Sequence, residues 1–272
     1  MIQRSFAVAL VALLLVPSQA LSQFVYGRSR EGGGRPVTMG LPDRPGGFTF
    51  CRLQYTSVRR EQGGVGWSTD YPGSDLNLTM RLAELTTAGP SAWSNGMAGI
   101  AVFRPSDPGL HQCPFVAASD AGTAGFTPEE VEALRSYLLK GGFLWADDFW
   151  GDRALAQFTG EMAKVLPEYA PVELPMDHPL YSIVYRIDEI PQITAIQFWS
   201  PGASTSERGA ESTTPRIYAV MDEAGRILVL MSHNTDIADG WEREADDASY
   251  FKLFSPDAYA IGVNVAVWIM TH

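Results

Sequence analysis

A helix followed at once by a short apolar run is the clearest pattern in the chain. Thr127 and Pro128 are typical of a helix start, and apolar residues then recur at helical spacing until Gly141-Gly142. The apolar run 143–146 that follows is bounded by glycines on one side and by acids on the other. This is the length of a fully buried strand, so we predict the central strand of a sheet here.

Helical and strand-like patterns alternate on both sides of this run. The segments predicted as strands before it are 48–55, 97–103 and 114–118. Further helices are predicted to begin at Ser74 or Asp75 and at Asp152. Strands that alternate with helices imply right-handed crossovers and a largely parallel sheet with helices on both faces. We therefore predict an α/β fold, a three-layer sandwich.

The pattern changes towards the C-terminus. Segments 216–221 and 226–231 flank an Asp-Glu-Ala-Gly turn, which predicts a β-hairpin. The last segment, from Ser255-Pro256 to Met270, is apolar almost all round. Its length and its Ser-Pro start favour a buried helix.

The N-terminus has the features of an export signal. Arg4 precedes an apolar stretch, and small residues suited to cleavage follow Pro17. The stretch is shorter than the roughly 20 residues that span a bilayer, although a retained membrane anchor is the alternative. We predict a signal peptide at 1–22, a flexible Gly/Pro-rich leader at 23–47 and one α/β domain at 48–272, located in the periplasm or secreted.

The charge of the chain narrows the class of partner. Its formal net charge is −11, and removal of 1–22, which contains Arg4 and no acid, makes it one unit more negative. Proteins bind nucleic acid and anionic membranes through clustered Lys and Arg, so neither is expected as a partner of this acidic chain after signal cleavage. A small molecule or another protein is the expected ligand, and the identity of any cofactor is left open.

Cys51 and Cys113 are the only cysteines. Two cysteines are too few for a paired Cys-x-x-Cys metal site. An exported location permits them to form a disulfide, and two buried free thiols are the alternative.

Several motifs resemble those of one bacterial family. They are the helix-to-strand join 134–148, Val165-Leu166-Pro167, Asp177-His178-Pro179-Leu180, the hairpin, and Asp236 with Asp239-Gly240-Trp241-Glu242. Together they resemble the domain-of-unknown-function family numbered 4159, over a range from about Phe48 to the C-terminus. That family is similar to the class I glutamine amidotransferase-like group, which implies a flavodoxin-like α/β sandwich.

The resemblance also bears on activity. In the amidotransferase group a cysteine nucleophile lies on the turn after the third strand. The matching turn here, 117–121, contains Ser119 and no cysteine, and Cys113 lies before that strand. Glutamine amidotransferase activity by that route is therefore not expected.

Ligands of open α/β sheets bind outside the carboxyl ends of the strands, which places our candidate site. The candidate ligand-binding residues at these ends and in the loops beside them are Trp67, Asp70, Ser119, Asp120, Asp147, Asp148, Trp150, Asp236, Asp239 and Trp241. Aromatic faces beside carboxylates suit sugars and other polyhydroxylated ligands, although tryptophans near sheet ends also close cores. Recognition of a ligand or partner is the leading hypothesis.

A hydrolase is the alternative. Ser119 lies between small residues, as in a nucleophile elbow, and His178 or His233 would be its base with Asp236 as orienter. The competing interpretation is that Ser119-Asp120 only turns the chain.

A second form of this alternative uses a divalent cation. Asp147 or Asp148 would join His178, Asp236 or Asp239 around the ion, or act as a general base. Successive strand residues point to opposite sides, so Asp147 and Asp148 are not expected to face one ligand. No set of metal ligands is assigned from the sequence.

Overall fold

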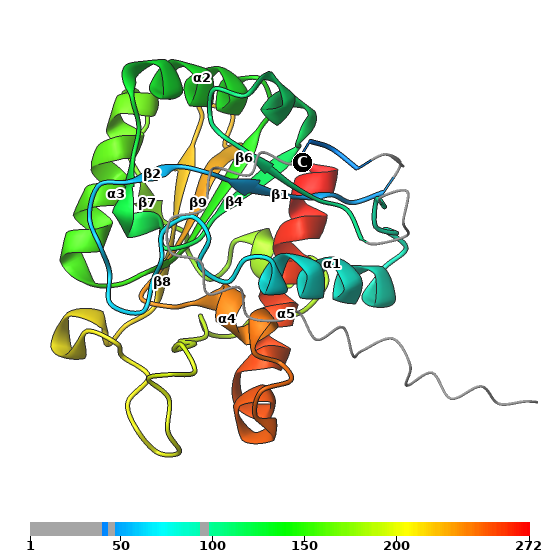
Figure 1. Cartoon of the computed structure of the whole chain (residues 1–272), viewed down its shortest axis with the longest axis vertical. Coiled ribbons are helices and arrows are strands. Elements are labelled where there is room, and N and C mark those ends of the chain that lie inside the picture. The colour runs from blue at the N-terminus through cyan, green and yellow to red at the C-terminus, as the bar shows by residue number, and fades with distance from the viewer. Residues whose placement is uncertain (1–39, 43–46, 93–97) are drawn as a thin grey trace, which may run out of the picture. The chain divides into compact units, whose positions relative to one another are not determined.

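A mixed sheet of seven strands forms the middle layer of the domain (Figure 1). The computed structural model describes residues 40–42, 47–92 and 98–272. The predicted signal peptide and most of the leader lie outside the described residues, as does Met97 at the start of one predicted strand.

The strands run across the sheet in the order β3-β1-β4-β6-β9-β8-β7. Their bounds in that order are Ile100–Phe103, Phe50–Leu53, Phe115–Ala118, Phe143–Phe149, Ile227–His233, Arg216–Met221 and Val172–Glu173. The strands from β3 to β9 are parallel, whereas β8 and β7 pair antiparallel. Counted along the chain, the parallel strands have the order 2-1-3-4-5, which is that of a doubly wound, flavodoxin-like sheet.

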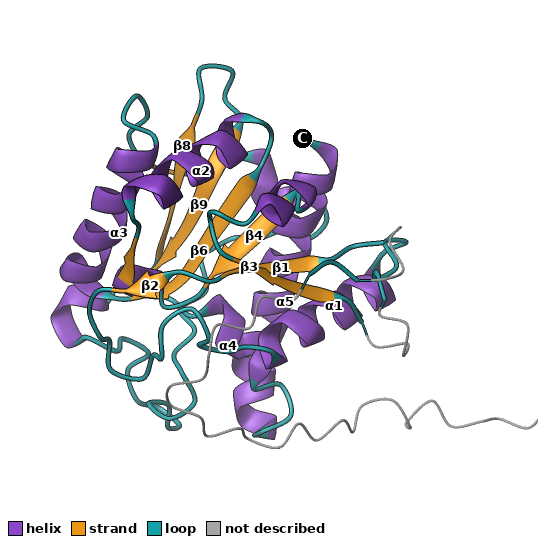
Figure 2. Cartoon of the chain, turned by 45° about the horizontal axis from the view of Figure 1, so that its top comes forward, coloured by secondary structure: helices purple, strands orange, loops and turns teal. Residues whose placement is uncertain are grey.

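Helices cover both faces of this sheet (Figures 1 and 2). One face carries α1 (Gly73–Leu85), α4 (Ile237–Glu242) and α5 (Ala248–Thr271), and the other carries α2 (Pro128–Leu139) and α3 (Gly151–Val165). Along β6, Phe143 and Trp145 face the first group of helices, whereas Leu144 and Ala146 face the second. The predicted three-layer α/β sandwich is confirmed.

Shorter elements lie in the connections. Strands β2 (Thr56–Ser57) and β5 (Ala124–Gly125) form a separate antiparallel pair. The 3-10 helices are η1 (Pro108–Gln112), η2 (Ala121–Thr123), η3 (Pro179–Ser182) and η4 (Gly209–Ser212).

Two local predictions are confirmed at the level of single hydrogen bonds or strands. At the start of α2, Thr127 Oγ1 accepts the Glu130 N–H at 3.2 Å, and Glu130 Oε2 accepts the Thr127 N–H at 3.0 Å. The hairpin is β8 followed by β9, and Gly225 in its turn has a φ of 81°, which glycine adopts without strain.

Helix α5 begins at Ala248, so the start predicted at Ser255-Pro256 is wrong. Asp247 caps the helix, because its carboxylate accepts the N–H groups of Ser249 and Tyr250 at 2.7 and 2.9 Å. By length and composition α5 could cross a membrane, but most of its apolar stretch is buried within the domain. It is the predicted buried helix, extended by two turns.

A buried ion pair explains a second difference, at the start of α1. This helix begins at Gly73, and neither Ser74 nor Asp75 caps it as predicted. Both bind Arg52 of β1 instead: Arg52 Nη2 donates to Ser74 Oγ at 2.9 Å and pairs with Asp75, and Nε donates to Asp75 Oδ2 at 3.2 Å. All three residues are at most 1% exposed, so the network ties α1 to β1.

Cys51 of β1 forms a disulfide with Cys113, which lies just before β4. The two Cα atoms are 6.2 Å apart and both residues are buried. The alternative of two free thiols is therefore excluded. The bridge joins residues 62 positions apart in the chain, and it fixes the strand β1 to the entry of its neighbour.

We expect the Cys51→Ala/Cys113→Ala variant to lose stability. Closing a loop of this length restricts the unfolded chain and contributes about 4 kcal/mol in the chain-entropy account, of which measured losses recover about half or more. Urea denaturation of wild type and variant measures the loss. A reductant should lower the free energy of unfolding of the wild type and leave that of the variant unchanged. A loss below about 1 kcal/mol would contradict this role.

Candidate functional site

The candidate site lies where the order of the parallel strands reverses. Strands β1 and β4 are neighbours, but the helical connections from them leave on opposite faces, and ligands of open α/β sheets bind beyond the carboxyl ends of such strands. Ser119 and Asp120 directly follow β4, and they are 2% exposed each. The sequence-based location of the site therefore coincides with the switch point of the sheet.

Three carboxylates meet at this edge, and we call Asp70, Asp148 and Asp236 the acidic cluster. One ligand oxygen of each lies within 4.8 Å of those of the other two. Asp70 comes from the loop before α1, Asp148 from the end of β6, and Asp236 is the N-cap residue of α4. Segments that are far apart in the sequence thus deliver like charges to one place.

The backbone at this edge is unusual in a consistent way. Asp70, Asp120, Asp148 and Asn234 have φ values of 63°, 48°, 52° and 59°, and they are the non-glycine residues with positive φ among those described. Asp and Asn tolerate this left-handed region better than other side chains, but it still costs energy. Such residues gather at ligand and active sites, where the surrounding structure holds them in place.

A left-handed turn at Asp148 interrupts the end of β6. The register of β6 against β9 shifts between Ala146 and Phe149. Asp148 belongs to the acidic cluster, whereas Asp147 Oδ2 accepts the Ala238 N–H, although the charges of both raise the pKa of Asp236. That the two neighbours do not face one ligand stays a prediction.

Neutral groups are the hydrogen-bond donors to the acidic cluster. Ser119 Oγ donates to Asp70 Oδ2 at 2.6 Å. Trp150 Nε1 donates to Asp148 Oδ1 at 3.0 Å, and the Asp239 N–H donates to Asp236 Oδ1 at 2.8 Å. Within the described part of the chain, the cluster forms no ion pair with Lys, Arg or His.

Burial and mutual repulsion raise the pKa values of the cluster. Burial is the main cause for all three carboxyls, and it raises each pKa well above the ordinary range. Charge adds to this effect: Asp70 is raised further by Asp239, Asp148 by Asp70, and Asp236 by Asp148. A bound cation would remove this penalty.

Asp120 and Asp147 flank the cluster, and burial raises the pKa of each to about 7. Asp120 Oδ2 accepts the Gly66 N–H and Asp147 Oδ2 accepts the Ala238 N–H, at 2.8 and 2.9 Å. Among the described residues, the second oxygen of each carboxylate has no hydrogen-bond partner. Both residues are more than nine-tenths buried, so these free acceptors are costly without a ligand.

A second group of acids, Asp239 and Glu242 of α4 together with Asp70, also brings ligand oxygens within 4.8 Å of one another. These acids already have a positively charged side chain beside them. Arg243 pairs with Asp239 Oδ1 at 3.3 Å and with Glu242 Oε2 at 2.8 Å. The two groups share Asp70 but differ in charge compensation. Our sequence analysis singled out neither Glu242 as a site residue nor Arg243, although the spacing of Asp239 and Glu242 on a helix was a usable signal.

The candidate histidines do not meet Ser119. His233 Nε2 lies 3.1 Å from the Gly151 carbonyl, and its ring packs on Phe149. The ring of His178 lies tilted against Trp268, near the end of α5. Tyr250, which donates to Asp239 beside the acidic cluster, lies 18 residues earlier on the same helix. Eighteen residues of helix span about 27 Å.

The only side-chain hydrogen bond from Ser119 goes to Asp70, so the triad geometry is not formed among the described residues. Burial lowers the pKa of both histidines and favours their neutral forms.

The candidate aromatic residues divide between the core and the edge. Trp241 packs against Trp145 in the core, with ring centroids 5.4 Å apart. These two rings, Ser119 and Asp147 line a cavity of about 10 Å³, room for about one water molecule. Trp67 is half-buried and lies against Tyr71, and the pair brackets Asp70 in the sequence.

The comparison with known families agrees with the motifs noted in the sequence. A family model described as Domain of unknown function (DUF4159) matches residues 49–270, a range that includes the whole acidic cluster. A search of curated proteins finds no match to the chain. The chain therefore belongs to the family described as domain of unknown function 4159.

Proposed function

We propose that this chain is an exported α/β domain that binds a divalent cation at the C-terminal edge of its sheet. The ligands are Asp70, Asp148 and Asp236. The observation that carries this proposal is that their carboxylate oxygens converge within 4.8 Å while their hydrogen-bond donors are neutral. A set of oxygen ligands alone favours hard cations such as Ca²⁺, Mg²⁺ or Mn²⁺.

The flanking acids support a ligand and not merely a charged surface. Asp120 and Asp147 are buried, and each retains an oxygen without a partner in the described structure. Each also raises the pKa of Asp148, so their charges act on the same place. Water molecules bound to a cation would donate to such acceptors, since hard cations keep part of their hydration shell.

Charge compensation selects this position over the neighbouring group of acids. Arg243 already balances Asp239 and Glu242, so a cation there would have to compete with a guanidinium. Asp148 and Asp236 have no such partner among the described residues. We therefore place the cation between Asp70, Asp148 and Asp236.

A cation-dependent hydrolase is the second candidate. Its specific support is the 2.6 Å hydrogen bond from Ser119 Oγ to Asp70, which would hold a hydroxyl beside the cation. Both cysteines are in the disulfide, and the turn after β4 contains Ser119, so glutamine hydrolysis through a cysteine is not proposed.

The wider assignments are also proposals. The buried disulfide supports export, because such bonds persist in oxidising compartments. The 2-1-3-4-5 strand order supports an architecture like that of class I glutamine amidotransferases. The acidic charge favours a small molecule or a protein as the further ligand, in preference to nucleic acid or a membrane.

Divalent cations should stabilise the folded protein. At a concentration 100 times the dissociation constant, binding adds about 2.7 kcal/mol, which corresponds to a rise in melting temperature of about 5 to 10 °C for a domain of this size. Differential scanning fluorimetry in chelator, Ca²⁺, Mg²⁺ and Mn²⁺ measures it. Unchanged melting temperatures in all three cations would refute the proposal.

Replacing one ligand should have opposite effects with and without the cation. Asp236→Asn retains an acceptor for the cap of α4 but removes one buried charge, so it should stabilise the metal-free protein by about 1 kcal/mol. In saturating cation the same variant should be less stable than wild type. Asp188→Asn makes the same charge change at an exposed position. It should neither stabilise the metal-free protein nor destabilise the protein in saturating cation. Equal effects in both conditions would indicate a purely structural acid.

The metal-free protein should lose stability as the pH rises from about 4 to 7. The pKa of Asp120 is raised to about 7 by burial, so between these pH values the folded state holds a proton that the unfolded chain has released. The contribution of this group to stability is complete below about pH 4 and is lost as the pH rises through 7. Denaturant titrations of wild type and Asp120→Asn should therefore agree near pH 4 and diverge up to about pH 7, with the variant more stable at neutral pH. A constant difference would contradict the shift.

A further inference from the structure

Residues 58–66, which follow β2, lie directly over one carboxylate of the site. The Gly66 N–H donates to Asp120 Oδ2 at 2.8 Å. At Gly64, an added Cβ atom would lie only 2.4 Å from the same oxygen, so the backbone itself is in contact with the carboxylate. Asp120 is 2% exposed, and so is Ser119 beside it.

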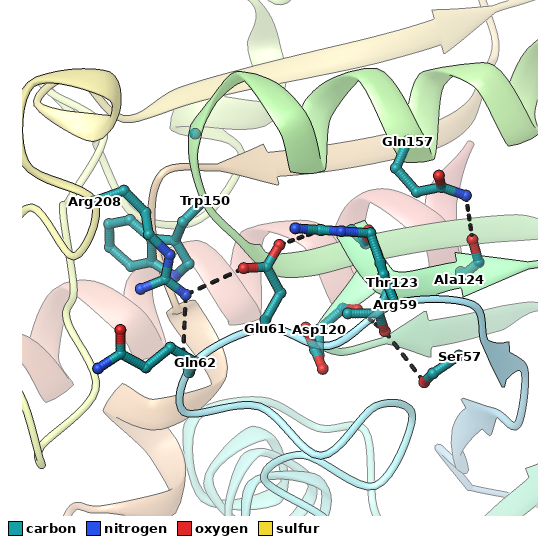
Figure 3. Close-up of polar contacts among 12 residues, drawn as sticks. Ser57, Arg59, Glu61, Gln62, Asp120, Thr123, Ala124, Trp150, Gln157 and Arg208 are labelled. Carbon is teal, nitrogen blue, oxygen red and sulfur yellow. Dashed lines mark hydrogen bonds and ion pairs between the residues drawn. The ribbon is translucent and has the colours of Figure 1, made fainter.

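Polar contacts clamp this segment at its middle (Figure 3). Glu61 lies between Arg59 and Arg208 and pairs with both, the latter at 3.3 Å. Arg208 Nη2 also donates to the Gln62 carbonyl at 3.0 Å. Arg208 comes from the segment just before η4, so the clamp joins two stretches of chain that are about 150 positions apart.

The composition of the segment suits movement. Val58 and Val65 are 60% and 71% exposed, so lifting the segment uncovers little apolar surface from these side chains. Gly63 and Gly66 have φ values of 93° and 77°, a region that glycine enters and leaves freely. Segments with few buried apolar contacts occupy the low end of local stability.

We propose that residues 58–66 form a lid over Ser119 and Asp120, and that a cation at the acidic cluster holds the lid closed. The proposal rests on the proposed function, because the coupling runs through Asp70. This ligand lies four residues after the lid ends, and the residue before it is bonded to the lid: the Val65 N–H donates to Thr69 Oγ1 at 2.9 Å, and Thr69 Oγ1 donates to the Gly66 carbonyl at 2.8 Å. Opening the lid shifts the chain that positions Asp70, so cation binding and closure favour each other equally.

Trypsin cleavage after Arg60 tests the coupling. Arg60 is exposed, but the protease needs the surrounding chain in an extended form, so cleavage reports the open population when opening is fast. At ten times the dissociation constant, Ca²⁺ should slow cleavage after Arg60 about tenfold relative to chelator. Cleavage after Arg186, whose side chain is 83% exposed, gives the activity of the protease in each condition.

Two variants separate the parts of the proposal. Asp70→Asn should abolish protection by Ca²⁺, whereas Asp188→Asn should retain it. Arg208→Gln should speed cleavage after Arg60 in chelator, and Glu61→Gln should do the same, because each removes the clamp. Unchanged cleavage in both clamp variants would overturn the lid.

The outcomes also separate this proposal from the proposed function. If Ca²⁺ raises the melting temperature but leaves cleavage after Arg60 unchanged, the cation site stands and the coupling is refuted. If Ca²⁺ changes neither quantity, nor Mg²⁺ nor Mn²⁺ in its place, the cation site is refuted and the coupling with it.

Discussion

The buried ion pair between Arg52 and Asp75 is the interaction on which the site depends. A charged pair removed from water is tolerated only when its geometry and remaining hydrogen bonds are satisfied, and removing one partner of such a pair costs about 3 to 5 kcal/mol. Here the bonds to Ser74 and to the Thr69 carbonyl complete the guanidinium. The same contacts fix the chain on both sides of Asp70. A network that ties α1 to the sheet therefore also places the first residue of the acidic cluster.

Charge compensation divides the acids at this edge into two kinds. Asp75 has Arg52, and Asp239 has Arg243, so the fold balances these carboxylates from within. Asp148 and Asp236 instead receive neutral donors; Asp236 is buried and Asp148 half-buried, and both lie near further negative charge. A protein that balances some buried acids with arginine leaves the others unbalanced at a cost in stability. The raised pKa values of these carboxyls favour protonation, which removes the charge in the metal-free protein, and a bound cation would supply the missing charge in its place.

The helices and strands could be predicted from residues close together in the sequence, whereas the arrangement of the candidate site depends on contacts between distant residues. The capping box at Thr127 and the hairpin could be predicted because each depends on residues a few positions apart. The start of α1 could not, because Asp75 fits a cap equally well and its true partner, Arg52, is 23 positions away. The convergence of Asp70 with Asp236 is of the same kind. The sequence identified both residues as candidates but gave no distance between them.

The turn at Asp148 shows why the candidate acids could be identified from the sequence while their arrangement in space could not be predicted. Strand alternation is a sound expectation for Asp147 and Asp148, but it does not reveal that the chain enters the left-handed region at Asp148, where the register against β9 shifts. That backbone state costs energy, so it persists only when the surroundings impose it. The bond from Trp150 Nε1 to Asp148 is one such constraint, and the Asn234 side chain, which binds the Gly151 N–H at 2.8 Å, is another. Strain held in this way at three acids of one edge shows that the closed structure, and not the local preference of these residues, sets the backbone at the proposed site.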